Sequence, residues 1–180
     1  MLRLVIPSIE MFDGKTQEFI QSKSYELQLE HSLVSLSKWE SKWHKPFLTA
    51  KDKTNEETID YIRCMTISQN VDPEAYKFIR QKQIDEIIEY IDAPMTATTF
   101  SQPNQKPTNK EVITAEIIYY WMIAFNIPFE CQKWHLNRLL TLVNVCSIKN
   151  QPKKKMGRKE AARNQKALNE ARKAKLNTKG

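Results

Sequence analysis

The chain has 180 residues, 41% of them hydrophobic and 27% charged, which fits one domain of roughly 150 residues with its own apolar core. Residues 149–180 contain 12 of the 28 basic residues but only two of the 21 acidic ones, so residues 1–148 have 16 basic against 19 acidic side chains. The basic character therefore belongs to a C-terminal arm, and any nucleic-acid-binding role for a basic surface must rest on that arm.

Residues 1–29 alternate between apolar and other side chains on a period of two, which predicts β-strands. The apolar positions are Leu2, Leu4 and Ile6 in the first segment and Tyr25, Leu27 and Leu29 in the second. Between them, Asp13-Gly14 favours a tight turn in which the glycine takes a positive φ. We therefore predict a β-hairpin or a short meander.

Residues 30–150 have the apolar spacing of α-helices. Capping boxes are predicted at Thr54–Glu57 and at Thr108–Glu111, and Asp72-Pro73 is typical of a helix start. The predicted helices run over 29–43, from 54 through 65, over 72–79 and 84–91, from 108 through 124, and from 128 through 143. The last two are expected to form an antiparallel hairpin at the centre of the core. Residues 92–110, with three prolines, are predicted to form a long loop.

Residues 151–180 are rich in Lys, Arg, Ala, Glu and Gln and have few large apolar side chains. This composition predicts a fraying helix or a disordered arm. The expected fold class is thus α+β and predominantly α-helical. It consists of a single globular domain over 1–150, with a β-hairpin over 1–29 and a helical core over 30–150, followed by a basic arm over 151–180.

Catalytic and metal-binding motifs are not found in the sequence. Cys131 and His135 have a spacing of four that two metal ligands on one helix face could use, but no companion pair with ligand spacing accompanies them. The chain also lacks the phosphate-binding, dinucleotide-binding, zinc-protease and serine-hydrolase motifs. Adjacent carboxylates fall in first helical turns or on polar helix faces. We therefore expect no enzymatic activity, no catalytic residue, no metal and no cofactor.

The tryptophans and the basic arm are the candidates for binding a partner. Trp39, Trp43 and Trp134 have helical spacing, which favours core packing, although tryptophans also dominate binding hot spots. The arm could be a solvated extension, a phosphate-binding segment or a segment that becomes ordered on an acidic protein. Its candidate contact residues are Lys153, Lys154, Lys155, Arg158 and Lys159.

The three cysteines are widely spaced and odd in number, which argues against a disulfide framework and favours a reducing compartment. The amino-terminal apolar stretch is too short for a signal peptide, and no apolar run reaches the roughly 18 residues of a membrane span. A soluble protein without a membrane association is expected.

Several blocks of the sequence together resemble a known family. They cover residues 29–43, 57–66, 94–98, 118–123 and 128–140 and the basic end at 176–180. This set is similar to small proteins encoded in the structural-gene modules of tailed bacteriophages, and among these to the tail assembly chaperones.

The resemblance implies a non-enzymatic, mainly helical protein that binds the tape measure protein, keeps its apolar helices soluble and helps recruit the major tail protein. It implies action in the host cell cytoplasm and is compatible with a homo-oligomer. Two alternatives remain open: a small nucleic-acid-binding protein that uses the basic arm, and a structural component of the virion such as a head-tail connector or tail-completion protein.

Overall fold

The computed structural model describes residues 1–8, 10–13, 17–50, 52–100, 112–150 and 158–176. The chain divides into two compact units, Met1–Ser147 and Ile148–Gly180. It is mostly helical with a small antiparallel N-terminal sheet, so the predicted α+β, predominantly α-helical class is confirmed.

The N-terminal segment forms two antiparallel strand pairs, β1 (Leu2–Ile6) with β4 (Tyr25–Leu29) and β2 (Glu10–Asp13) with β3 (Glu18–Gln21). Leu4 lies opposite Leu27 in the first pair, so the two alternating apolar sets share one face of the sheet. That face is buried, whereas Val5 on the other face is 62% exposed. The predicted hairpin is confirmed, and Gly14 at its turn lies outside the described residues.

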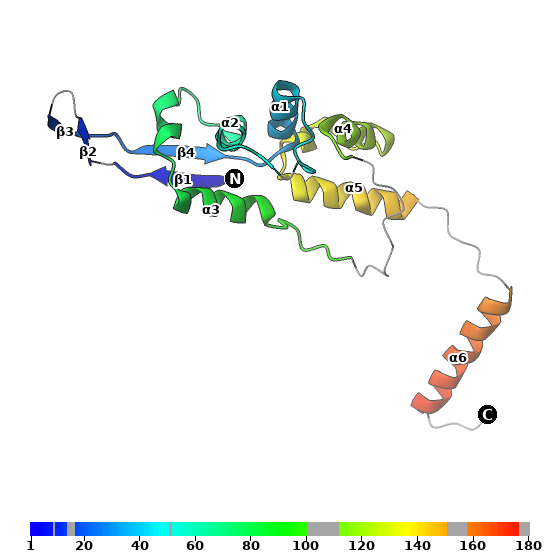
Figure 1. Cartoon of the computed structure of the whole chain (residues 1–180). Coiled ribbons are helices and arrows are strands. Elements are labelled where there is room, and N and C mark those ends of the chain that lie inside the picture. The colour runs from blue at the N-terminus through cyan, green and yellow to red at the C-terminus, as the bar shows by residue number, and fades with distance from the viewer. Residues whose placement is uncertain (9, 14–16, 51, 101–111, 151–157, 177–180) are drawn as a thin grey trace. The chain divides into compact units, whose positions relative to one another are not determined.

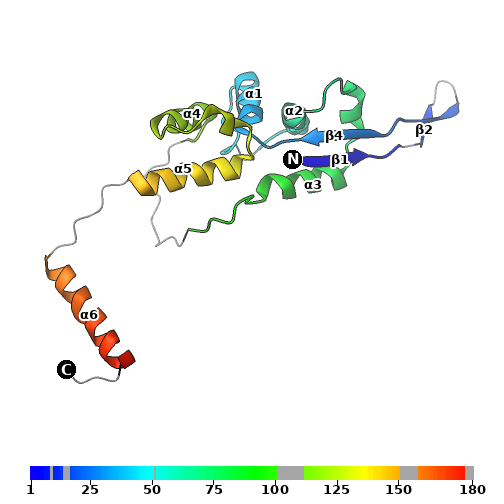
Figure 2. The same cartoon turned by 180° about the vertical axis from the view of Figure 1, so that it is seen from behind.

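The helices of the first unit are α1 (Leu33–Trp43), α2 (Asn55–Met65), α3 (Gln81–Asp92), α4 (Ala115–Ala124) and α5 (Leu136–Asn150), of which the last extends past the unit boundary. Two 3₁₀ helices, η1 (Pro73–Phe78) and η2 (Phe129–Lys133), connect them. In both views α3 lies next to β1, and α2 lies close to β4 (Figures 1 and 2).

Local sequence signals account for several helix boundaries. Thr54 caps α2 as predicted, because its Oγ1 accepts from the Glu57 amide at 3.2 Å while Glu57 Oε2 accepts from the Thr54 amide at 2.8 Å. Helix α1 begins later than predicted: Leu29 ends β4, and Ser32 is the N-cap. The capping box predicted at residues 108–111 lies outside the described residues, and α4 begins at Ala115.

The first unit has two apolar clusters. The first joins the β1–β4 sheet to α2, η1 and α3, and the second joins α4, η2 and α5. Helix α1 supplies Trp39 to the first cluster and Leu33 and Leu36 to the second. It also runs close to α2, α4 and η2, so α1, rather than the predicted hairpin of the last two helices, links the core.

The segment after Pro128 does not form the continuous helix that its sequence predicted. The backbone at His135 pairs with Ser32 in an isolated antiparallel bridge, and the Leu136 amide donates to the His31 carbonyl at 2.7 Å. Since this pairing needs an extended backbone, the chain ends η2 at Lys133 and starts a new helix, α5, at Leu136.

Candidate functional site

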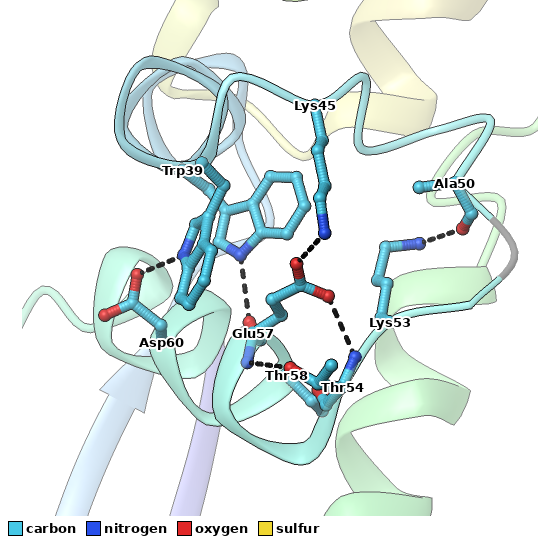
Figure 3. Close-up of polar contacts among 9 residues, drawn as sticks. Trp39, Lys45, Ala50, Lys53, Thr54, Glu57, Thr58 and Asp60 are labelled. Carbon is cyan, nitrogen blue, oxygen red and sulfur yellow. Dashed lines mark hydrogen bonds and ion pairs between the residues drawn. The ribbon is translucent and has the colours of Figure 1, made fainter.

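Trp39 and Trp43 lie at the contact between α1 and α2, in a group of five residues that we call the α1–α2 cluster: Trp39, Trp43, Lys45, Glu57 and Asp60. The Trp39 indole N–H donates to the Glu57 backbone carbonyl at 2.9 Å, and the Trp43 indole N–H donates to Asp60 Oδ2 at 2.8 Å. Figure 3 shows the Trp39 indole directed at the second helix. Each indole therefore pins α1 to a group on α2.

The carboxylates of this cluster are buried but well supplied with donors. Glu57 is 1% exposed and accepts from Lys45 and from the Thr54 amide (Figure 3). Asp60 is 5% exposed and accepts from Lys42 at 2.5 Å in addition to Trp43. Each buried charge is thus paired, as the low dielectric of a protein interior requires.

Both carboxylates are ionised at neutral pH. The hydrogen bond from Lys45 is the main reason that the pKa of Glu57 lies below its ordinary value. For Asp60, burial raises the pKa, but the hydrogen bonds from Lys42 and Trp43 outweigh it and the net pKa is lowered. A general acid needs a raised pKa and access to substrate. This cluster provides neither, and its geometry is that of a structural lock between two helices.

The three tryptophans selected from the sequence occupy different environments. Trp39 has no exposed surface and contacts Trp43, Phe47 and Tyr61, so in this conformation it belongs to the core and not to a partner groove. Trp43 and Trp134 are half-buried, and the Arg138 guanidinium lies 4.1 Å from the Trp134 ring centroid. Of the three, Trp43 and Trp134 retain surface that a partner could touch.

The Cys131–His135 spacing does not form a ligand pair on one helix face. Cys131 belongs to η2, and His135 lies in the extended link before α5. His135 Nε2 is 3.0 Å from the Tyr90 carbonyl oxygen, and its Nδ1 accepts from the Asn137 amide at 3.3 Å. Among the described residues, no group of three or more His, Cys, Asp or Glu side chains is arranged to hold a metal ion.

A buried histidine pair, His31 and His135, is a feature that the sequence analysis missed. The two rings approach edge to face with centroids 5.1 Å apart, and His31 Nδ1 lies 2.6 Å from the Tyr61 hydroxyl oxygen. Burial, and secondarily the neighbouring His135, lowers the pKa of His31 from 6.5 to about 3. Both histidines are therefore neutral at physiological pH. No sequence signal predicts this contact, because the residues are remote in the chain.

A groove of about 330 Å³ lies beside α1 and is lined by Ser32, Ser35, Lys38, Cys64 and Lys133 among others. The Cys64 thiol is the candidate nucleophile in this groove. Burial raises the pKa of this thiol, so it stays protonated and a weak nucleophile. The Ser35 hydroxyl donates to backbone carbonyls of Ser32 and Glu30, so it is held in the α1 cap. The groove thus supplies no activated nucleophile.

Helix α4 carries exposed apolar side chains near the second cluster. Tyr120 is 67% exposed and Ile123 is 61% exposed, while Phe129 of η2 is 53% exposed and its ring lies 6.5 Å from that of Tyr119. We call Tyr119, Tyr120, Ile123 and Phe129 the α4 patch. The buried residues of α4 are Ala115, Ile118 and Met122. The helix is apolar on nearly every side, so periodicity cannot select its buried face.

The predicted contacts of the arm are only partly described. Lys153, Lys154 and Lys155 lie outside the described residues, and Arg158 and Lys159 begin helix α6 (Arg158–Leu176) of the second unit. Every side chain of α6 from Ala162 to Leu176 is exposed. Within the described part of the chain, no helix combines the length and apolar character needed to cross a bilayer.

Comparisons of this chain with protein-family models, with curated proteins and with solved structures gave no match.

Proposed function

We propose that this protein is a non-enzymatic assembly chaperone of the phage-tail type, and that it holds apolar helical segments of a tape measure protein on the α4 patch. The observation that supports the proposal is the exposure of Tyr120, Ile123 and Phe129 in one neighbourhood. Ile123 follows Tyr119 by four residues and Tyr120 by three, so Tyr119, Tyr120 and Ile123 lie on one side of α4.

Such a face is suited to a helical partner. Tyrosine is enriched in binding hot spots, because it buries a large apolar area while keeping a hydroxyl for the rim. An amphipathic helix can lay its apolar side across a surface of this kind. Glu116 and Glu130 are exposed next to the patch and favour a partner segment with basic flanks.

The chaperone role needs no chemistry from the α1–α2 cluster. We assign a stabilising role to that cluster. Trp39, Glu57 and Asp60 are buried, and hydrogen bonds join the two tryptophans of α1 to Glu57 and Asp60 of α2. The proposal also includes the roles that the resemblance implies: recruitment of major tail protein, self-association, and action in the host cytoplasm.

The test is co-expression with the tape measure protein of the same genome, followed by affinity capture and a solubility assay. The wild-type chain is expected to keep the tape measure protein soluble and to retain it on the resin. A Tyr120→Ser/Ile123→Ser variant should retain at least tenfold less tape measure protein than the wild type, because it lacks two proposed hot-spot side chains. Folding should be unaffected, because exposed substitutions change stability by about 0.5 kcal/mol or less.

The matched control is Val5→Ser/Ile88→Ser, which removes two side chains that are 62% and 49% exposed elsewhere in the first unit. It should retain the tape measure protein at the wild-type level. Equal loss in both double variants would contradict a role for the α4 patch, and failure of the wild-type chain to bind would contradict the chaperone proposal. Incorporation into purified virions would favour the structural alternative.

A further inference from the structure

Helix α6 presents basic residues along one side. Counted at 100° per residue, Arg163, Lys166 and Lys173 fall within an arc of about 80° that extends over about 15 Å of helix axis. We call these three residues the α6 stripe. Glu170 also falls within the arc, so this side of α6 carries a net of two positive charges.

Local helix electrostatics explain only part of this pattern. Lys173 and Lys175 lie in the last turn, where cations stabilise the helix macrodipole. Arg163 and Lys166 lie in the middle of the helix, where the dipole gives them no advantage, and both are exposed. These two charges are therefore available for a ligand.

The absence of apolar contact surface restricts the class of ligand. Between Ala162 and Leu176 the large apolar side chains are Leu168 and Leu176, which lie eight residues apart, and residues 151–180 contain no aromatic residue. A membrane-surface helix or a helix-binding protein partner would require an apolar stripe, and base stacking would require aromatic rings. What α6 offers is charge on an exposed helix.

Exposed positive charge of this kind gains the most binding free energy from a polyanion whose charges are closely spaced. Exposed ion pairs with an acidic protein each contribute little binding free energy, because water and salt screen them. A phosphodiester backbone releases condensed counterions for every phosphate that is neutralised, which makes several lysines sufficient for binding. We propose that the α6 stripe binds the phosphate backbone of nucleic acid without sequence preference. This site is independent of the α4 patch and of the chaperone proposal.

Fluorescence anisotropy with the full chain tests this site. The probes are a labelled duplex DNA of about 20 base pairs and a single-stranded RNA of the same length, each titrated between about 50 and 200 mM salt. The stripe variant is Arg163→Gln/Lys166→Gln. The control, Arg172→Gln/Lys175→Gln, removes the same charge from the opposite side of α6.

The wild-type chain and the control are expected to bind with a steep salt dependence. The stripe variant should lose about two units from the slope of log affinity against log salt, since each lost phosphate contact removes about one. Glu170→Gln should tighten binding. The better of the two probes identifies the natural form of the backbone.

Equal loss in the two double variants would mean that net charge alone is responsible, and it would overturn the stripe. Absence of binding to both nucleic acids, or binding to polyglutamate with similar affinity, would overturn a phosphate ligand and favour an acidic protein. In every variant the urea unfolding of the first unit should match that of the wild type, which excludes misfolding as the cause.

Discussion

The histidine pair predicts that acidification destabilises the first unit through His31. In the folded chain, burial and the neighbouring His135 lower the pKa of His31 to about 3, whereas an unfolded histidine keeps its ordinary value of 6.5. Between these two pH values the unfolded chain binds more protons than the folded chain. The free energy of unfolding therefore falls as the pH drops below 6.5 and stops falling below about 3.

The size of the effect follows from the same two pKa values. At a pH of about 5, His31 should lower the free energy of unfolding by about 2 kcal/mol relative to neutral pH, and the full effect is about 5 kcal/mol. The pKa of His135 is also lowered by burial, so its contribution has the same sign. A variant that lacks only the His31 imidazole therefore isolates the larger of the two pH-dependent contributions to stability.

Urea unfolding followed by tryptophan fluorescence measures this difference, because Trp39 is fully buried in the first unit. His31→Asn removes the titrating ring but keeps an acceptor for the Tyr61 hydroxyl. Its stability loss between pH ~7 and pH ~5 should be about 2 kcal/mol smaller than that of the wild type. The control His44→Asn replaces an exposed histidine at a left-handed position that asparagine also tolerates, and it should retain the wild-type pH dependence. Equal pH dependence of His31→Asn and wild type would refute the reasoning.

Three further substitutions test the packing around α4. Glu40 is 8% exposed and accepts from the Phe47 amide at 2.8 Å and the Ala115 amide at 2.7 Å, so Glu40→Ala should lower the free energy of unfolding by about 2–4 kcal/mol, as it leaves two amides without a partner. An unchanged urea midpoint would contradict this capping role. Met122→Ala should cost about 2–5 kcal/mol, because Met122 has no exposed surface, whereas Ile123→Ala at 61% exposure should cost about 0.5 kcal/mol or less. Thermal unfolding of the two variants would show the reverse order if the buried face of α4 were assigned incorrectly.

Local patterns were sufficient where a residue's environment depends on its near neighbours. The alternation over residues 2–6 and 25–29 identified the buried face of the sheet, since a strand exposes every second residue to the same side. The Thr54–Glu57 capping box was predictable for the same reason, because all four atoms of the motif lie within one turn.

The same local patterns were insufficient where contacts between residues far apart in the sequence determine the structure. The continuous helix predicted from residue 128 is divided because the backbone at His135 pairs with Ser32, far away in the sequence. Trp39 and Trp43 lie four residues apart in the same helix, yet the position of α2 leaves Trp39 fully buried and Trp43 half-buried.

The sequence by itself determined the α+β class, the antiparallel hairpin and the concentration of positive charge in the last part of the chain, since these depend on residue type and local periodicity. The tertiary structure alone decided which side of α4 is buried, which donors neutralise Glu57 and Asp60, and that two histidines meet in the core. The physical reason is that an all-apolar helix has no preferred side until its neighbours are placed, and a buried charge or imidazole acquires its pKa from atoms brought to it by folding.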